Sequence, residues 1–339
     1  MDALAADLQL FELPTARGCT YVLPAQHFAL GLSAGRGFGS ATEIATARKL
    51  GVEDAEVDRL KNAIPDTLAA GPLSPADLKV KLGDKVRSLG EEGKKRGLTT
   101  TLPLALGLLQ MEGRIRRKPT NGRLDTQKYD YELWDPPVAG IPDEATAGKQ
   151  LAELFFRWTG ASTLKDFRTF SAFTVKRAHL ACDQAGIVPF GCEPDLLGLP
   201  GNYEEFMAYD APGKPAYSLV CNLDSYLHYR RTGNFWLHEE DYARMMPTEK
   251  GVAAGSELAE LASHAILDRG RLIGLWEFDG ENGAIVWTTW VRADDELRAK
   301  VAATEKYIRE ELGDARSFSL DSPASRRPRL EVLRGMGIR

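Results

Sequence analysis

The segment that most constrains the fold covers residues 99–123, TTTLPLALGLLQMEGRIRRKPTNGR, where an apolar stretch gives way to a basic one. Pro103 is tolerated in the first turn of a helix that begins at residue 100 or 101, and Gly113 is a natural C-cap. Five of the ten residues over 114–123 are Arg or Lys, and Asn121-Gly122 favours a tight turn because both positions accept positive φ. The segment therefore predicts a helix followed by a basic hairpin with strands over 114–119 and 123–131.

A helix followed by a basic β-hairpin is the arrangement that a winged helix presents to DNA. Guanidinium and ammonium groups suit phosphate oxygens. The whole chain carries a net charge of −5, so any contact with DNA must be local. We expect the hairpin to contact phosphates, and a merely solvated hairpin is the alternative. The residues expected to make these contacts are Arg114, Arg116, Arg117, Lys118 and Arg123.

The same order of elements recurs further along the chain. GPLSPADL over 71–78 and GASTLKDF over 160–167 share a glycine, a capping hydroxyl and an acidic residue in the first helical turn. Helices are expected over 52–70, 149–159 and 175–185, with a strand after the last of them. The proline-rich segment 135–145 separates the two units. We interpret this as a structural repeat, with coincidence among common capping residues as the alternative.

The last third of the chain has a different character. Residues 219–231, 264–279 and 283–291 are β-rich, 280–283 form a hairpin turn, 294–312 form a charged helix, and the tail carries SRRPR over 325–329. We expect an α+β fold of tandem winged-helix units followed by a small, barrel-like β-rich region. The predicted domains are a partial N-terminal unit over 1–51, winged-helix units over 52–135 and 143–200, and a C-terminal domain over 201–339.

Cysteines, histidines and the N-terminus argue against several classes of protein. The cysteines at 19, 182, 192 and 221 lack paired spacing, which predicts reduced, mostly buried thiols in a cytosolic protein. The five histidines are scattered without metal spacing. The N-terminus lacks the pattern of an export signal, and no apolar run is long enough to span a bilayer. We expect a cytoplasmic, nucleoid-associated monomer that uses neither cofactor nor metal.

Four segments in order resemble the tandem winged-helix DNA glycosylase family of the AlkZ and YcaQ type. RGCTYVLPAQHF (17–28) is similar to that family's Arg-Gly-Thr segment, and LAELFFRWTGASTLKDFRTFSAF (151–173) to its Gly-Pro-Ala-Thr and Asp-Phe stretch. NLDSYLHYRR (222–231) resembles its Phe-Asp-x-Tyr-Leu segment, and RGRLIGLWEFDGENGAIVW (270–288) its Gly-x-x-x-Gly-x-Trp hairpin. The resemblance implies winged-helix modules around a concave face that binds double-stranded DNA. It also implies removal of alkylated bases or release of interstrand crosslinks without metal or cofactor. A positioned water and a carboxylate or glutamine suffice for that hydrolysis.

One departure from the family leaves the catalytic residues unknown. The family's Gln-x-Gln or Gln-x-Asp element lies upstream of the Arg-Gly-Thr segment, but here only 16 residues precede Arg17, which leaves no room for that unit. Gln110-Met111-Glu112 looks like the element, yet it lies at the end of a recognition helix where the resemblance gives no catalytic group. Either the sequence is truncated, or this is a DNA-binding relative without the family's chemistry.

Further cations are candidates for contacts with DNA, each with a structural alternative. Arg17 and Thr20 match the family segment and line its concave face, or else Arg17 pairs with a carboxylate. Arg230 lies near Asp224 and Tyr226 in sequence, and a buried pair between Asp224 and Arg230 is the simpler account. The other candidate cations lie just before, or at the start of, the last helix of each unit, where they could contact DNA. The alternative is that they belong to an ordinary charged loop. These are Lys94, Lys95, Arg96, Lys176 and Arg177.

Three hypotheses follow for function. The first is a double-stranded DNA-binding protein of the glycosylase family that acts on damaged bases. The second is a non-enzymatic binding or regulatory protein on the same scaffold, which the acidic net charge and the missing element favour. The third is a small-molecule enzyme using the C-terminal region around Asp224, for which the sequence supplies no phosphate loop, nucleophile elbow or metal set.

Overall fold

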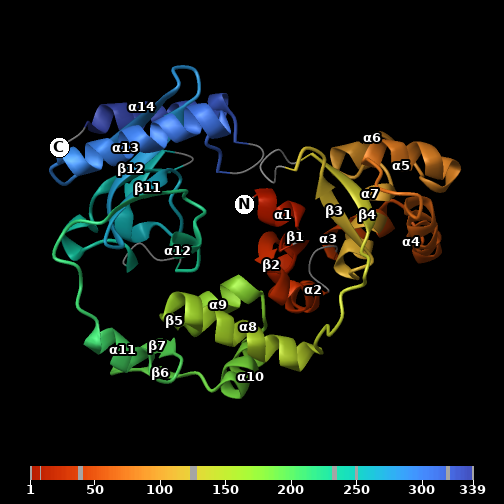
Figure 1. The fold of residues 1–339 in the computed structure, drawn as a ribbon, viewed down its shortest axis with the longest axis horizontal. Coiled ribbons are helices and arrows are strands. Elements are labelled where there is room, and N and C mark those ends of the chain that lie inside the picture. The colour runs from red at the N-terminus through yellow and green to blue at the C-terminus, as the bar shows by residue number, and fades with distance from the viewer. Residues whose placement is uncertain are drawn as a thin grey trace. The chain divides into compact units, whose positions relative to one another are not determined.

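The protein contains two compact units of mixed helix and strand, seen in a computed structural model (Figure 1). The structure describes residues 2–7, 9–36, 41–122, 128–230, 235–248, 251–317 and 321–337. The first unit comprises Met1–Trp158 and Thr163–Pro200, and the second comprises Thr159–Ser162 and Gly201–Arg339. The mixture of helices and strands agrees with the expected α+β class, while the winged-helix identity of the modules stays a prediction.

The first unit contains most of the helices. Its helices are α1 (Asp2–Ala6), α2 (Phe28–Gly35), α3 (Ala41–Lys49), α4 (Asp54–Leu68), α5 (Pro75–Leu82), α6 (Gly90–Lys95), α7 (Leu102–Met111), α8 (Glu144–Thr159), α9 (Leu164–Ser171) and α10 (Val175–Ala185). Its strands are β1 (Leu10–Pro14), β2 (Thr20–Pro24), β3 (Ile115–Pro119), β4 (Tyr129–Leu133), β6 (Val188–Phe190) and β7 (Glu193–Gly198); β5 (Ala161–Thr163) lies at the boundary of the units.

Both predicted helix caps form, with matching geometry. The Ser74 hydroxyl accepts a hydrogen bond from the Asp77 N–H at 3.1 Å and donates to the Asp77 carboxylate at 2.7 Å. The Thr163 hydroxyl accepts from the Asp166 N–H at 3.0 Å and donates to its carboxylate at 2.7 Å. Such caps satisfy N–H groups that the first helical turn leaves unpaired. The local signal shared by the two segments therefore produces the same local structure twice.

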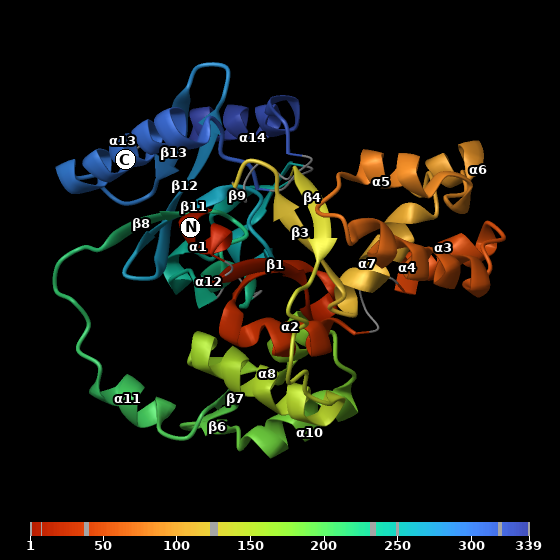
Figure 2. The ribbon, with the colours of Figure 1, turned by 45° about the vertical axis from the view of Figure 1, so that its right-hand side comes forward.

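The predicted helix and hairpin over 99–123 are present. Helix α7 is followed by Gly113 at φ +66°, and β3 pairs antiparallel with β4 in a register that sets Ile115 opposite Leu133. Strand β4 begins at Tyr129, later than expected, and residues 123–127 lie outside the described residues. Figure 2 shows the hairpin beside α7. The hairpin is thus anchored on the helix that precedes it.

A single apolar core joins α4, α5, α7 and the hairpin. Leu60 and Ile64 from α4, Leu109 from α7 and Ile115 from β3 have no exposed surface. The buried residues of α4, which include Leu60 and Ile64, recur at helical spacing, so one face of that helix is apolar. Burying each such side chain stabilises the fold by about 1.5–3 kcal/mol. The core therefore fixes α7, and with it every side chain that α7 presents elsewhere.

The second unit is built on a four-stranded antiparallel sheet. The strands of the second unit are β8 (Tyr217–Val220), β9 (Met245–Thr248), β10 (Gly251–Ala254), β11 (His264–Asp268), β12 (Arg271–Asp279) and β13 (Ala284–Thr289). Its helices are α11 (Asn202–Ala208), α12 (Ser225–His228), α13 (Asp295–Tyr307), which continues as a π-helix over Ile308–Leu312, and α14 (Pro323–Met336). The sheet order is β13-β12-β11-β8, and β9 pairs with β10 separately. The described sheet is open at β8 and β13, so a barrel-like arrangement is not confirmed.

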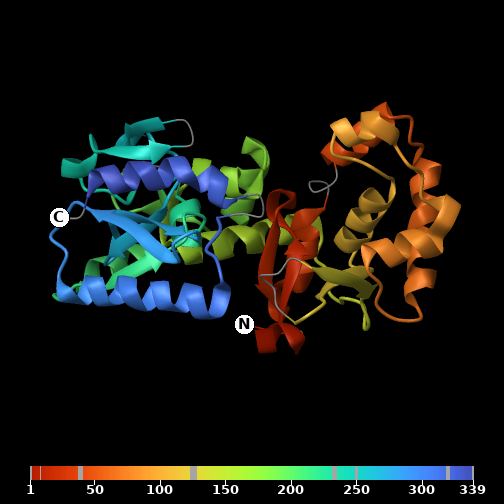
Figure 3. The same cartoon turned by 90° about the horizontal axis from the view of Figure 1, so that it is seen from above.

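Helices cover both faces of this sheet (Figure 3). Leu297 and Val301 of α13 pack with Ile273 on one face. Leu333 of α14 packs with Leu275 on the other. Because alternate residues of a strand point to opposite faces, β12 is buried along nearly its whole length. The hairpin turn expected over 280–283 joins β12 to β13, as predicted.

Several sequence expectations need correction. Residues 219–231 were expected to be β-rich, but the strand ends at Val220 and Asp224 caps the short helix α12 through the Tyr226 N–H. The charged connector before residue 99 contains α6, and α8 begins at Glu144, inside the expected linker. The basic tail over 325–329 lies within α14. In each case polar or charged residues that were expected in a strand, a connector or a tail occupy a helix.

The arginines of α14 form a buried charge network with the sheet. Arg326 has no exposed surface; it donates to both Asp314 carboxylate oxygens at 2.7 and 2.9 Å and to the Ala315 carbonyl at 2.7 Å. Arg329 donates to Glu277 at 2.6 Å and to Asp321 at 3.1 Å. Buried charges are tolerated only when paired and hydrogen-bonded. These pairs hold α14 in register on β12.

We predict that Arg326→Met destabilises the protein by about 3–5 kcal/mol, because it leaves Asp314 without its buried partner. Arg327→Met is the matched control: Arg327 is 61% exposed and pairs with Glu281 at 3.1 Å on the surface. Its loss should cost about 0–1 kcal/mol. Urea unfolding followed by circular dichroism measures both. Equal losses would contradict a stabilising role for the network.

We predict that protonation of His264 destabilises the fold as the pH falls. Burial, with Arg329 nearby, lowers the pKa of His264 from 6.5 to about 4, and its Nδ1 accepts a hydrogen bond from the Asn222 N–H at 3.1 Å. The unfolded chain therefore binds more protons between pH 6.5 and 4, so about 3 kcal/mol of stability is present above pH 6.5 and lost toward pH 4.

Comparing His264→Gln with the wild type across pH 4–7 by urea unfolding isolates this contribution. The comparison is needed because Glu277, whose pKa burial raises, contributes with the opposite sign as it protonates. Parallel curves for the two proteins would contradict the assignment to His264.

Candidate nucleic-acid interface and adjoining cleft

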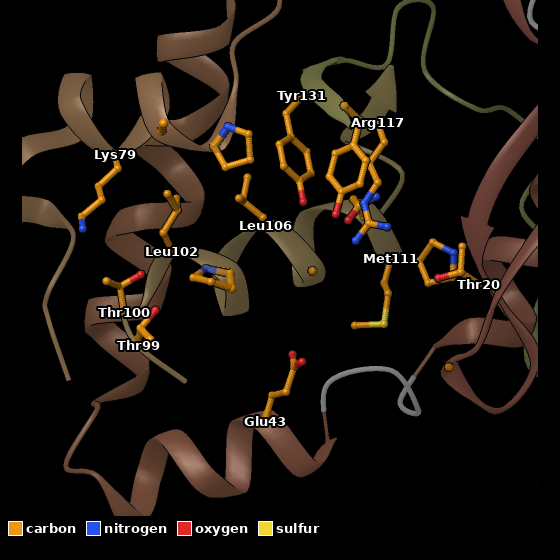
Figure 4. A pocket seen from close by; sticks show the side chains of 18 residues that line it. Thr20, Glu43, Lys79, Thr99, Thr100, Leu102, Leu106, Met111, Arg117 and Tyr131 are labelled. Atoms are coloured by element: carbon orange, nitrogen blue, oxygen red, sulfur yellow. The ribbon is translucent and has the colours of Figure 1, made fainter. Parts of the chain in front are cut away.

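A cleft of about 560 Å³ opens in the first unit beside the basic hairpin (Figure 4). Helix α7 contributes the largest share of its lining, from Leu102 to Met111. Helices α3 and α5, the β3–β4 hairpin, strands β1 and β2 with the segment that joins them, and residues 99–100 before α7 contribute the rest. A volume of this size suits a small ligand rather than a single water.

Gln110 places a polar group in the lining of the cleft. Only 4% of the surface of Gln110 is exposed. Within the described part of the chain, its side-chain amide forms no hydrogen bond. Because Gln110 lines the cleft, the donor and the acceptor of its amide are available to a bound group.

Glu43 lies across the cleft, on α3. Figure 4 shows its side chain directed from α3 into the cleft, and partial burial raises the pKa of its carboxyl. Over the described ranges, no cation pairs with it. A Cβ added at Gly107 of α7 would meet only the Glu43 Oε2, at 4.0 Å. The glycine thus leaves open space between the helix backbone and this carboxylate.

The hairpin wall of the cleft is aromatic. The Arg117 guanidinium lies 4.3 Å from the centre of the Tyr129 ring, and the Tyr129 and Tyr131 rings are 5.7 Å apart, edge to face. Burial lowers the pKa of Arg117, but Tyr131, Tyr129 and Glu12 outweigh it and raise that pKa. Arg117 is therefore held within the protein rather than directed freely into solvent.

The other hairpin cations differ in availability. Arg116 is mostly buried, donates to Glu132 at 2.8 Å and lies over the rings of Phe11 and Trp134. Lys118, 58% exposed, lies 3.7 Å from Glu132, and Arg114, 42% exposed, lies 3.7 Å from Glu112. Such loose surface pairs exchange readily with other anions. Arg123 lies outside the described residues.

The cations before α7 lie on and after α6. Lys94 is 70% exposed and Lys95 is exposed, whereas Arg96 donates to Glu92 at 2.7 Å. At the start of α10, Lys176 is exposed, while Arg177 pairs with Glu144 at 2.9 Å and stacks on the Phe173 ring at 3.8 Å. In each group the arginine is engaged by the protein, whereas the lysines are exposed; Lys94 has only a loose surface pair with Glu91, at 3.9 Å.

Comparison with known proteins decides the family. The family model described as "DNA glycosylase AlkZ-like" matches residues 1–318. The chain belongs to the AlkZ-like DNA glycosylase family. A solved structure, Streptomyces sahachiroi DNA glycosylase AlkZ, shares 19% sequence identity and has a TM-score of 0.64; the match covers 90% of this chain and 80% of that one. At this identity the likeness shows the fold. No curated protein matches the chain.

Membership in the AlkZ-like family makes DNA the class of substrate and DNA repair the class of process. It also gives a context for the segment around Arg17. Arg17 adopts φ +61° and donates to the Thr169 carbonyl at 3.3 Å, which ties the β1–β2 connection to α9. Thr20 is exposed and lines the cleft. Arg17 therefore has a structural contact with α9, whereas Thr20 is accessible from the cleft.

The cluster around Arg230 lies in the second unit. Its guanidinium stacks on the Phe235 ring at 4.0 Å and lies 5.7 Å from the Tyr226 ring. Tyr226 donates to the Gly270 carbonyl at 2.9 Å, and Asp224 serves as a helix cap. The described contacts place Asp224 at a helix cap and Arg230 against aromatic rings, and the expected Asp224–Arg230 pair stays a prediction. This AlkZ-like chain therefore presents Arg230 between aromatic rings.

Neither metal clusters nor membrane-spanning helices were found. Within the described ranges, no group of three or more His, Cys, Asp or Glu side chains is arranged to hold a metal ion. No helix in that part of the chain is long and apolar enough to cross a membrane. The four cysteines are present as free thiols. The expectation that they are mostly buried is wrong, because Cys19 and Cys192 are exposed and only Cys182 is buried.

The sequence analysis did not single out Glu43, and it treated Gln110 only as part of a helix end; both residues line the cleft. Glu112, the other end of the Gln110-Met111-Glu112 element, pairs with Lys61 and lies 3.7 Å from Arg114. Gln110 instead faces the cleft, because residues two apart on a helix point in different directions. The available signal was Gly107, an unusual residue inside an apolar helix.

Proposed function

We propose that this AlkZ-like protein binds double-stranded DNA through exposed cations of its first unit and releases alkylated bases. Membership of the family carries the proposal, and the basic hairpin beside a cleft supports it. The same reaction would unhook an interstrand crosslink attached through an alkylated base. The winged-helix units over 52–135 and 143–200, and action as a monomer at the nucleoid, belong to this proposal.

The phosphate contacts are assigned to cations whose charged groups remain in solvent. Arg116 and Arg117 are not assigned to phosphate contacts, because other side chains already engage them. Arg116 pairs with Glu132, and Arg117 contacts Glu12 and the Tyr129 ring. Exposed lysines lose little when they exchange a loose partner for a phosphate. The remaining contacts are Arg114, Lys118, Lys94, Lys95 and Lys176.

The proposed reaction is hydrolysis of one N-glycosidic bond. The bond between the sugar C1′ and the base nitrogen breaks, and its electron pair leaves with the base. A water oxygen bonds to C1′ and loses a proton. A cationic alkylpurine leaves as a neutral base, so the protein mainly positions water and stabilises positive charge on the sugar. The residue that does so is left unassigned.

A non-enzymatic DNA-binding protein is the second candidate. The observation that favours it is the ion pairing of Glu112 with Lys61, which engages this carboxylate away from Gln110. Gln110 and Glu112 are therefore not a ready-made catalytic pair. Duplex binding without release of any base would support this candidate.

We predict that Lys94→Ala combined with Lys118→Ala weakens duplex binding and flattens its salt dependence. Removing two phosphate contacts should lower the slope of log K against log salt by about 1.8. Fluorescence anisotropy at salt concentrations from about 50 to about 200 mM, which bracket physiological ionic strength, measures this slope. The charge-matched control is Lys300→Ala with Lys306→Ala, both exposed on α13.

Equal slopes for the two double variants would contradict the assignment of these phosphate contacts. The first double variant is preferable to changes at Arg116 or Arg117. Those side chains brace the hairpin against Phe11, Glu12 and Glu132, so a loss of binding there could reflect altered folding.

We predict that the wild-type protein releases 7-methylguanine from methylated duplex DNA. Mass spectrometry of the freed base and alkaline cleavage of the resulting abasic site give two independent readouts. Heat-denatured protein is the control. Normal duplex binding with no release from methylated or crosslinked DNA would contradict the enzymatic proposal and leave the second candidate.

A further inference from the structure

The four-stranded sheet of the second unit ends in two edge strands, and only one of them is covered by a side chain. At the β13 edge, the Ile285 N–H donates to the Glu305 carboxylate of α13 at 2.8 Å. Strand β8 forms the other edge, beside β11 (Figure 2). In the described part of the second unit, no hydrogen bond reaches the backbone of Tyr217 or Leu219 from outside the β8–β11 pair. The β8 edge is therefore open to a further strand.

The backbone groups of β8 alternate in direction along the strand. The Arg269 N–H donates to the Ala216 carbonyl at 3.2 Å, and these two residues continue the register that sets Ser218 opposite Leu267. In an antiparallel pair, residues that exchange hydrogen bonds alternate with residues whose N–H and C=O groups point away. Ser218 is therefore bonded to β11, and the residues on either side of it direct their backbone groups to the open edge.

The β8 edge lacks the side chains that usually prevent strand pairing. Natural proteins protect exposed edges with Lys, Pro, bulges or short strands. Strand β8 contains neither a charged residue nor a proline, and its register with β11 is regular. Ser218, at its centre, is exposed, small and uncharged. The strand is only four residues long, which makes any pairing weak without preventing it.

We propose that the β8 edge pairs antiparallel with the β8 edge of a second copy of this chain, so that two sheets join into one. The occupant is a second copy because the edge is self-complementary: under a two-fold axis its N–H groups meet C=O groups, and no like charges face each other on the strand. For so short a strand we expect a Kd on the order of 100 µM, with a monomer at lower concentrations.

Neighbouring residues define one register for this pairing. With the two-fold axis at Ser218, Tyr217 of each copy lies opposite Leu219 of the other, and both outward-facing residues exchange hydrogen bonds. Moving the axis toward the N-terminus would require an N–H from Pro215, which has none. Moving it toward the C-terminus would require the Cys221 carbonyl, which already accepts a hydrogen bond within the next turn at 2.9 Å.

Cysteine crosslinking tests this register. Across the axis the two Ser218 Cα atoms should lie about 4.5 Å apart, which a disulfide can bridge. Ser218→Cys is made in a protein whose cysteines outside the core, at 19, 192 and 221, are changed to serine. After oxidation with copper phenanthroline it should run as a dimer on a non-reducing gel, and reductant should restore the monomer.

Ala216→Cys in the same background is the matched control. Ala216 is also exposed and lies two residues from Ser218. In the proposed register its two copies are separated by about 13 Å along the strands, too far for a disulfide. This variant should therefore stay monomeric on the gel.

Sedimentation equilibrium tests the association without crosslinking. The unmodified protein should shift from monomer to dimer between about 10 and about 500 µM. Ser218→Lys sets two like charges directly opposite each other across the axis and should weaken dimerisation about fivefold. Ala216→Lys adds the same charge away from the axis and should leave dimerisation nearly unchanged. Thermal unfolding checks that each variant folds.

The outcomes decide the proposal without reference to DNA. A monomer at every concentration would overturn it. So would failure of Ser218→Cys to crosslink, equal crosslinking of the two cysteine variants, or equal effects of the two lysine variants. Because the pairing uses residues of the second unit and the experiments contain no nucleic acid, their failure leaves the DNA-binding proposal intact.

Discussion

The contact between Arg116 and the aromatic rings around it organises the candidate interface. The guanidinium pairs with Glu132 within the hairpin and lies over Phe11 and Trp134, so it joins β3–β4 to the N-terminal strands. Its neighbour Arg117 points the other way, because successive residues of a strand face opposite sides. One basic run is thereby divided between a structural brace and the wall of a cleft.

Local features of the fold could be predicted from sequence. The Ser74 and Thr163 caps, the helix before Gly113 and the hairpin after it all depend on residues within a few positions of one another. Helix α14 could not be predicted in this way. Its SRRPR segment is too polar to resemble a buried helix, and it is stable there because Asp314, Glu277 and Asp321 supply the opposite charges.

The candidate site depended on contacts that sequence reasoning cannot see. Arg116 and Lys118 have similar side chains and lie two residues apart, yet Arg116 is largely buried and Lys118 is 58% exposed. The difference comes from Phe11, more than 100 positions away. Likewise, Glu43 meets the face of α7 only through the tertiary fold. The family resemblance located the chain among DNA glycosylases without identifying this cleft.

The charge network of the second unit has a consequence for handling the protein. Arg326 and Arg329 are paired in the interior, where dissolved ions screen poorly, while the lysines assigned to DNA are largely exposed to those ions. Raising the ionic strength therefore acts on the complex with DNA far more than on the fold. A salt gradient would elute intact protein from a nucleic-acid column and leave α14 seated on its sheet.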